Sequence, residues 1–421
     1  MAHAGLPYRE LMALTRRVAA LVLAAVVSTD VLIAACAQPG ARMPSAANAP
    51  TAPTAPTTPT TPTTPTTPTV TPSTRPSTLV SGGDPTASAA GRADQITLAF
   101  AGDVHFERGL NRLVTAPQPL AAAVKDTLGR ADFAMVNLET ALGEGGAPLP
   151  GKKYTFRAPV GSLAALAAVG VDAVSMANNH AADFGDAVFA QTLDARGRAP
   201  IPVVGIGRDE AEAFAPLRLD VRGVKVAVLS SSQIRDETSS QHSAGPTSPG
   251  IATNLDAGRL RRAVRQAAAT SDLVVVMLHW GTQYTGCADE PQRETARLLA
   301  ADGADVIVGG HAHRPQGGGW FGAQHAAYVA YGLGNFVWYN NDGASAETGV
   351  LTLTVDPTAA RATAGAQGPR ARSVVVGEQW SPMLIGDDGV PRPPTSGATQ
   401  ARLAGAWDAA TTCAGLDDQR H

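Results

Sequence analysis

The chain has 421 residues and a formal net charge of −3, with few aromatic residues and three cysteines. The nearly balanced charge and the absence of a basic run in the sequence argue against a nucleic-acid partner. Three cysteines are too few to form the framework of a chain of this length, so we expect a domain held together by a hydrophobic core.

The first 36 residues have the features of an export signal. Three arginines precede an apolar run over residues 18–27, and the sequence Ile-Ala-Ala-Cys ends at Cys36. This ending resembles the cleavage site of a bacterial lipoprotein, at which the cysteine becomes lipidated. The alternatives are a plain secretory signal and an uncleaved anchor helix, although Asp30 would be costly inside so short a membrane span. We therefore expect an extracytoplasmic bacterial protein, tethered to the cell membrane by a lipid anchor.

Residues 37–94 are of low complexity. The stretch 51–78 is almost entirely threonine, proline and alanine. Such a composition has too little apolar surface to offset the entropy lost on ordering. We expect a disordered linker, which serves either as an extended stalk or as a passive connection.

A folded domain is expected over residues 95–386, followed by a C-terminal tail over 387–421 that packs on it. Strands are expected at 96–101, 133–136, 173–176, 203–206, 224–229, 273–278 and 306–308. Helices are expected at 120–128, 162–169, 260–269 and 294–301. Three later strands, at 326–331, 335–338 and 350–355, have no helices between them. Helices early in the domain and strand pairs late in it indicate a layered α/β fold.

The stretch 306–313 suggests how this fold builds a site. A β-branched run leads through Gly309 and Gly310 to His311 and His313. A parallel strand presents side chains at its carboxyl end, and glycines allow a tight turn there. Imidazole is the commonest metal ligand near neutral pH. A single His-x-His could equally be a turn with polar residues.

Five further stretches carry polar residues in a similar way, at 100–105, 135–139, 175–183, 277–281 and 331–336. Taken singly, each has an ordinary explanation as a turn, a helix cap, surface or a satisfied core histidine. Together with the stretch 306–313, however, they contain five of the nine histidines, all at predicted strand ends. We therefore expect a metal site.

Seven side chains in these stretches are candidate ligands: Asp103, His105, Glu139, Asn179, His279, His311 and His313. One catalytic ion uses three or four protein ligands. Seven ligands therefore fit two divalent ions that share a carboxylate, at a separation of about 3.5–4 Å. Nitrogen and oxygen ligands without a thiolate suit Mn, Fe or Zn better than Mg or Ca.

The order of these motifs resembles the calcineurin-like metallophosphoesterase superfamily, and in detail its CapA, or poly-γ-glutamate capsule synthesis, family. The matching motifs are Asn137-Leu138-Glu139, Tyr154-x-Phe156-Arg157, Asn178-Asn179-His180 with Asp183 and Gly185, His279-Trp280-Gly281, and Leu333-Gly334-Asn335-Phe336. The resemblance covers residues 96–340. It implies an α/β/β/α sandwich with mixed sheets.

The resemblance also implies roles for the ligands. Asp103, His105, Glu139 and His313 would hold the first metal, and Glu139, Asn179, His279 and His311 would hold the second. His180 would meet the substrate as an acid or as a stabiliser of the transition state. The sequence departs from the superfamily in having Glu139 where the bridging residue is usually Asp. It also has Ala181 where an acid usually follows the Asn-His pair, so Asp183 is expected to orient His180.

Substrate contacts are expected from Arg157, Asn178 and Asn335. Arg157, with Lys152 and Lys153 nearby, could hold an anionic group. The alternative for Arg157, Lys152 and Lys153 is a solvated basic loop.

Two functions remain open. The first is a metal-dependent hydrolase or transferase that acts on an anionic envelope or capsule polymer, such as poly-γ-glutamate, or on a phosphoester. The second is a non-catalytic factor that binds or assembles such a polymer. A degenerate binding module is disfavoured by the complete ligand set. Fold similarity does not decide between the first two.

Cys287 and Cys413 remain once Cys36 is lipidated. Outside the cytoplasm, thiols tend to oxidise. A bridge between them would pin the tail, with its helix-like stretch 400–408, to the loop that follows His279. We expect this bridge to form, and the alternative is two free thiols.

Overall fold

The structure is a computed structural model that describes residues 95–322, 326–340, 342–365, 368–369 and 371–418. The predicted signal with Cys36 and the predicted linker lie outside the described residues. In the described part, no helix is both long and apolar enough to cross a membrane.

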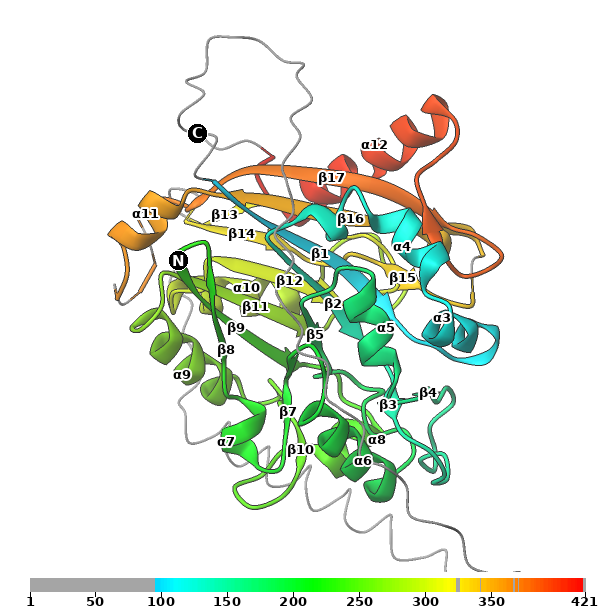
Figure 1. The fold of residues 1–421 in the computed structure, drawn as a ribbon. Coiled ribbons are helices and arrows are strands. Elements are labelled where there is room, and N and C mark those ends of the chain that lie inside the picture. Colours follow the sequence, from blue (N-terminus) through cyan, green and yellow to red (C-terminus); the bar gives the residue numbers. More distant parts are fainter. Residues whose placement is uncertain (1–94, 323–325, 341, 366–367, 370, 419–421) are drawn as a thin grey trace, which may run out of the picture. The chain divides into compact units, whose positions relative to one another are not determined.

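The first of two large sheets has the strand order β18-β17-β16-β1-β2-β5-β6, with β15 paired to β1 (Figure 1). Its strands are β1 (Ile96–Val104), β2 (Phe133–Leu138), β5 (Ala173–Ser175), β6 (Val203–Val204), β15 (Asn335–Val337), β16 (Glu347–Val355), β17 (Val375–Ile385) and β18 (Pro391–Arg392). Strands β1, β2, β5 and β6 run parallel, whereas β16, β17 and β18 are antiparallel additions.

The second sheet has the order β13-β14-β12-β11-β9-β8. Its strands are β8 (Leu217–Val221), β9 (Val224–Ser232), β11 (Leu273–His279), β12 (Val306–Gly310), β13 (Gly318–Phe321) and β14 (Ala327–Ala330). The four inner strands are parallel, and both edge strands are antiparallel. Two small ladders join β3 (Ala141–Leu142) to β4 (Arg157–Ala158) and β7 (Ile206–Gly207) to β10 (Gly250–Ile251).

Side-chain alternation along the strands produces the layers. In β1, Leu98 and Phe100 enter the core between the two sheets, whereas Ala99 and Ala101 face the helices, as expected for successive residues on opposite faces of a strand. The first sheet is covered by α4 (Gln118–Val124), α5 (Ser162–Ala168) and α6 (Asp186–Arg196), and the second by α9 (Ala257–Ala268) and α10 (Glu290–Ala301). This arrangement confirms the predicted α/β/β/α sandwich with mixed sheets.

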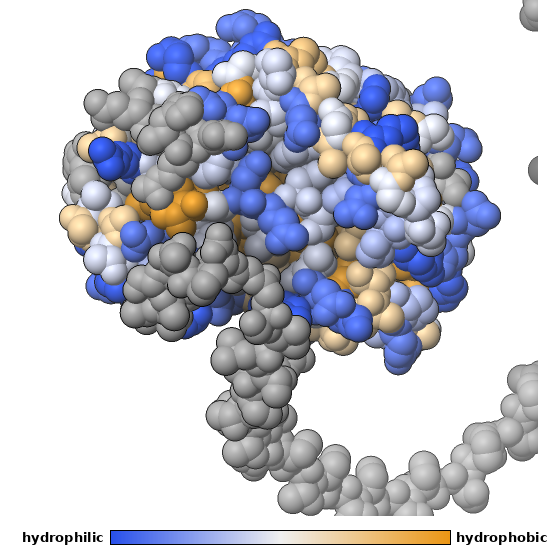
Figure 2. Space-filling view, turned by 90° about the horizontal axis from the view of Figure 1, so that it is seen from above, coloured by the Kyte–Doolittle hydropathy of each residue, from blue (hydrophilic) through white to orange (hydrophobic). Residues whose placement is uncertain are grey.

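Shorter helices lie in the connections: α3 (Arg112–Thr115), α7 (Glu210–Ala213), α8 (Glu237–His242) and α11 (Pro357–Ala362). On the face shown in Figure 2, hydrophobic residues form small patches among hydrophilic ones. Such a surface is normal for a domain whose large apolar side chains are mostly inside.

Two predicted elements need correction. The expected strand 203–206 is divided into β6 and β7 at Gly205, which has φ of 86°. A Cβ there would lie 2.5 Å from that of Ala177, so the chain turns where only glycine fits. The expected helix 120–128 ends at Val124, and a separate 3₁₀ turn follows at Leu128–Arg130.

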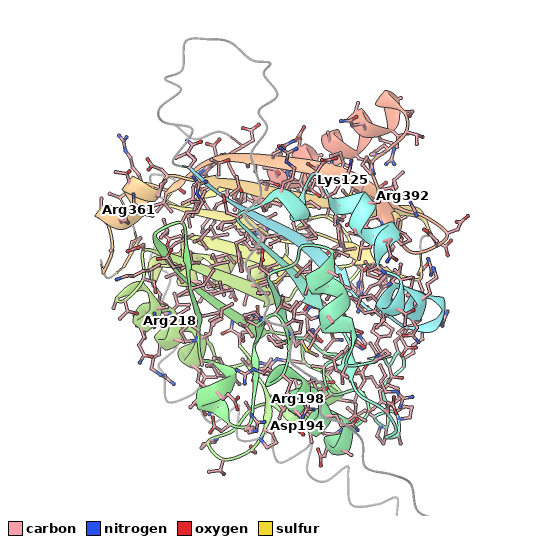
Figure 3. All side chains as sticks on the ribbon, viewed as in Figure 1. Lys125, Asp194, Arg198, Arg218, Arg361 and Arg392 are labelled. Carbon is pink, nitrogen blue, oxygen red and sulfur yellow. A yellow bond between two sulfur atoms is a disulfide. The ribbon has the colours of Figure 1, made fainter. Side chains whose placement is uncertain are left out.

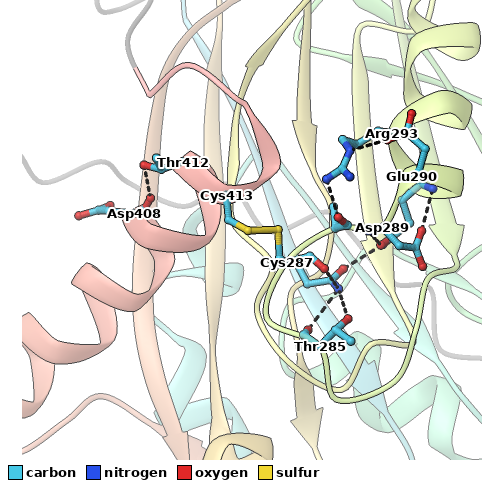
Figure 4. Close-up of a disulfide and its surroundings, with 11 residues drawn as sticks. Thr285, Cys287, Asp289, Glu290, Arg293, Asp408, Thr412 and Cys413 are labelled. Atoms are coloured by element: carbon cyan, nitrogen blue, oxygen red, sulfur yellow. Dashed lines mark hydrogen bonds and ion pairs between the residues drawn. A yellow bond between two sulfur atoms is a disulfide. The ribbon is translucent and has the colours of Figure 1, made fainter.

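The C-terminal segment is part of the sandwich. Strand β18 extends the first sheet, and α12 (Gly397–Ala414) contacts β13 and β17. Trp407 of α12 stacks on Trp380 of β17 with ring centroids 4.0 Å apart. A disulfide joins Cys413 of α12 to Cys287 in the loop after β11, with Cα atoms 5.8 Å apart (Figure 4). The bridge favoured by the sequence is therefore present.

We expect thiol labelling of the unreduced protein under denaturing conditions to find neither Cys287 nor Cys413 free. The residues are separated by 126 positions, and closing so long a loop stabilises the folded state by at most about 4–5 kcal/mol. Cys287→Ser, Cys413→Ser and the double variant should lose similar free energies of unfolding, measured by denaturant titration. Two reactive thiols per chain would contradict the bridge.

Candidate metal centre

The carboxyl ends of parallel strands from both sheets meet at one place, as expected for open α/β sheets. The first sheet brings Asp103 from β1 and Glu139 just after β2, and the second brings His279 from β11 and His311 just after β12. The amide of Glu139 donates to the carbonyl of Val104 at 2.7 Å. All seven predicted ligands are buried.

Two groups of side chains at this place could hold a metal ion. One is Glu139 with His279 and His311, and the other is Asp103 with Glu139 and His313. Within each group, the ligand atoms lie within 4.8 Å of one another. Glu139 belongs to both groups, which is the sharing that two ions with a common carboxylate would need.

The other two predicted ligands lie beside these groups. The Oδ1 atom of Asn179 lies 2.7 Å from Nε2 of His279. In the described part of the chain, Nε2 of His105 and Oε1 of Glu139 are buried without a hydrogen-bond partner. Unpartnered buried polar atoms are costly, and a cation would satisfy both. The donor set therefore fits divalent metal.

The backbone is strained where the histidines enter the centre. His311 and His313 have φ values of 84° and 54°, which residues other than glycine rarely adopt. Gly310 precedes them, and a Cβ on it would lie 2.4 Å from Oδ1 of Asp103. Glycine at this position thus allows β12 to approach β1 closely.

Burial sets the protonation of the centre. It lowers the pKa of His279 to about 4 and that of His311 well below its ordinary value of 6.5. Burial also raises the pKa of Asp103 to about 6, and the charge of Glu139 adds to this effect. Both imidazoles are consequently neutral near pH 7, the form in which histidine binds metal.

His180 stands at the edge of the centre and belongs to neither ligand group. Its Nδ1 lies 2.6 Å from Oδ2 of Asp183, and its Nε2 lies 3.6 Å from Oε1 of Glu139. Burial lowers the pKa of His180 well below 6.5, and the positive charge of Lys152 adds to the effect. Burial raises the pKa of Asp183 to about 7, although Lys152 opposes this rise. Asp183 thus occupies the orienting position expected for it.

Two residues predicted to contact substrate, Asn178 and Asn335, lie behind the ligands. Asn178 donates to Oδ1 of Asn137 at 3.0 Å and accepts from the amide of His180 at 3.0 Å. Asn335 has its Oδ1 2.8 Å from Nδ1 of His313 and donates to the carbonyl of Ser345. Both are buried with their amides engaged, so in this structure they position other side chains. Their contact with a substrate stays a prediction.

The basic residues Lys152 and Arg157 both have partners within the protein. The ammonium of Lys152 is buried between Asp183, at 2.5 Å, and Asp236, at 3.1 Å. Arg157 donates to the carbonyl of Gly145, and its guanidinium lies 4.4 Å from the centroid of the Phe184 ring. The two buried ion pairs show that Lys152 is not part of a solvated loop. Arg157 is half-buried, and the substrate contact expected from it stays a prediction.

Sequence reasoning assigned no role to Asn137 and none to the ring of Phe156. Nδ2 of Asn137 lies 2.8 Å from Oδ1 of Asp103 and 3.2 Å from Nδ1 of His279, linking the two sheets. The ring of Phe156 stacks against His105 and also contacts the ring of His180. Both residues lie inside the motifs that match the CapA family, and this position was the feature of the sequence that could have pointed to a role for them.

Fold and site together define a layered α/β protein built around a buried centre that could hold metal. A profile of the family described as "Bacterial capsule synthesis protein PGA_cap" matches residues 97–340. Because this match covers more than half of the chain, the chain belongs to that family, and the resemblance found in the sequence is confirmed.

Several proteins with known names are similar to part of this chain. It is 30% identical over 166 residues to the PGA biosynthesis protein CapA of Bacillus subtilis (strain 168), covering 39% of this chain and 42% of the relative. It is 28% identical over 177 residues to the capsule biosynthesis protein CapA of Bacillus anthracis, covering 42% of each. The matches thus span about two fifths of these relatives' lengths. A probable polyglutamine synthesis accessory protein of Mycobacterium tuberculosis is 24% identical over 271 residues, covering 54% of this chain and 71% of the relative.

The solved structures that align with this chain have lower sequence identity to it. A phosphatase from Mycoplasma pneumoniae aligns with a TM-score of 0.43 and 14% identity, covering 71% of this chain and 95% of that one. A 5'-nucleotidase from Candida albicans SC5314 aligns with a TM-score of 0.38 and 9% identity, covering 75% of this chain and 58% of that one.

Proposed function

We propose that this chain is a dimetal hydrolase or transferase of the CapA type that acts on an anionic envelope or capsule polymer, or on a phosphoester. The observation that carries the proposal is the position of Glu139. This carboxylate belongs to both ligand groups, and the His180–Asp183 pair stands 3.6 Å from it. Two ligand groups with an adjacent acid–base pair form an arrangement suited to hydrolysis.

The residues of the centre have separate roles in metal binding and proton transfer. Asp103, His105, Glu139 and His313 would hold one ion, and Glu139, Asn179, His279 and His311 the other. Bound ions of this kind supply an activated water and polarise a substrate oxygen. Asp183 favours the tautomer of His180 that has its proton on Nδ1, which leaves Nε2 to exchange a proton with the substrate. Lys152 and the amide of Phe156 fix Asp183 in place.

The polymer class rests on the relatives. Two Bacillus proteins that match part of the chain are named for PGA and capsule biosynthesis. A carboxylate-rich polymer is therefore the substrate that we assign first, and a phosphoester is the second.

A non-catalytic binding or assembly role is the alternative. The observation that favours it is the name of the mycobacterial relative, which is called an accessory protein.

The test is an assay of the Mn-loaded protein against a γ-glutamyl oligomer, a phosphodiester and a nucleotide. We expect turnover of at least one substrate, lost on chelation and restored by Mn. A protein that holds two ions yet turns over none of them would contradict the catalytic proposal and support the assembly role.

We further propose that the chain is exported and tethered through Cys36. Cys36→Ala should abolish lipidation, because the lipid is attached to that thiol, and should release the protein from membranes or leave it unprocessed. Fractionation and labelling with a radioactive fatty acid measure both effects. The double variant Cys287→Ala/Cys413→Ala is the control and should remain in the membrane fraction. Unchanged membrane association of Cys36→Ala would favour an ordinary anchor.

A further inference from the structure

Strand β9 ends beside the candidate metal centre without contributing a ligand to it. It pairs with β11 in parallel, so that Ser232 lies opposite His279. The amide of Gln233 then donates to the carbonyl of His279 at 2.8 Å. The segment that follows β9 therefore begins directly next to a candidate ligand.

A cleft of about 580 Å³ opens along this segment. Its polar lining consists of Gln233, Arg235, Asn254, Thr282, Asp289 and His311. His311 belongs to one of the two ligand groups. The cleft thus connects the surface with the His279–His311 side of the centre, and we call it the β9 cleft.

Asn254 is an unused hydrogen-bonding group in the wall of this cleft. Its backbone amide donates to the carbonyl of Ser232 at 2.7 Å, which fixes its position. The residue is only 4% exposed, and its Oδ1 is buried without a partner in the described part of the chain. Because an unpaired buried carboxamide oxygen is costly, it favours a ligand that brings an N–H or O–H donor.

Charge in the β9 cleft comes from Arg235 and Asp289. Asp289 is occupied, because it caps α10 through the amide of Gln292 at 3.0 Å and accepts from Thr282 at 3.0 Å. Arg235 is exposed, and within the described residues its guanidinium has no ion pair. A free guanidinium at the mouth of a cleft is suited to binding a carboxylate in bidentate geometry.

We propose that the β9 cleft binds the substrate chain, with Arg235 on a carboxylate and Asn254 on a neighbouring amide N–H, so that the reacting bond lies on the His311 side. This inference rests on the proposed function and adds a binding site to it. An acidic polyamide offers both groups in one repeating unit. A phosphodiester offers the negative charge but no amide hydrogen beside it.

Binding can be measured on protein stripped of metal, by calorimetric titration with a γ-linked pentaglutamate. Arg235→Gln should weaken binding about 10- to 100-fold, as expected for the loss of a hydrogen-bonded charge pair. Arg235→Lys should recover part of the loss, because an ammonium keeps the charge without the planar fork. Asn254→Leu should also weaken binding. Because Arg235 is exposed, Arg235→Gln tests the cleft even if Asn254→Leu folds poorly.

Arg361→Gln is the matched control and should bind the pentaglutamate like the wild type. Arg361 is an exposed arginine on α11 (Figure 3). This helix follows the end of β16 that pairs with the amino end of β1, so it lies at the opposite end of the sheet from the centre.

Two outcomes would overturn the proposal. One is pentaglutamate affinity that is equal in the wild type and Arg235→Gln. The other is a phosphodiester dinucleotide that binds in an Arg235-dependent manner while the pentaglutamate does not bind. Metal content, measured separately, reports on the proposed function. If Arg235→Gln loses pentaglutamate binding, the cleft proposal is supported even when the wild type holds no metal ion. If the wild type holds metal but binds pentaglutamate independently of Arg235, the cleft proposal is refuted and the proposed function is not.

Discussion

Glu139→Gln is expected to lose both metal ions. Glu139 is fully buried, and its carboxylate is the one group that the two sets of candidate ligands share. The amide of glutamine has a similar shape but carries no charge, and it cannot bridge two cations as a carboxylate does. We therefore expect the purified variant to retain well under one ion per chain by elemental analysis.

The matched control is Glu144→Gln. Glu144 lies five residues further along the same segment and is exposed. This variant should keep the metal content of the wild type. If Glu139→Gln retained close to two ions, or lost only one of them, Glu139 would not be the shared ligand.

His180→Ala separates catalysis from metal binding. His180 belongs to neither ligand group, yet its Nε2 lies 3.6 Å from Glu139. Removing a positioned acid–base group typically lowers the rate about 10²–10⁴-fold. We expect the variant to lose activity on this scale in a steady-state assay while its metal content stays at the wild-type level.

His242→Ala controls for the loss of a buried histidine. His242 is also buried and pairs with a carboxylate, Asp186, at 3.0 Å, but it lies on α8 outside both ligand groups. Its variant should keep both activity and metal. His311→Ala removes a candidate ligand and is expected to lose metal. If His180→Ala lost metal as readily as that variant, the proposed separation of roles would be wrong.

The sequence revealed most of the centre because strand ends follow a general rule. Polar residues directly after buried apolar runs meet at one edge of parallel sheets, and Asp103, Glu139, His279 and His311 all lie there. Long-range partners could not be found in this way. Lys152 looked like part of a basic loop, but it is buried against Asp183 and Asp236, which lie far from it in the chain.

The fold was predicted less completely. Strand β17 and the edge strands β8 and β13 were missed, although the Leu-Arg-Leu-Asp-Val sequence of β8 has the alternation of a half-buried strand. Helix α6 was also missed. The sequence did not reveal the β9 cleft, because β9 ends in three serines, followed by Gln233, rather than in typical ligands. In addition, Asn254 reaches the cleft from a separate segment.

The central claim is that one buried centre holds two ions. Elemental analysis of the folded protein, purified at neutral pH with Mn or Zn supplied, tests this claim most directly. We expect close to two ions per chain, because Glu139 links the two groups of candidate ligands. A protein that binds no metal under these conditions would contradict the account.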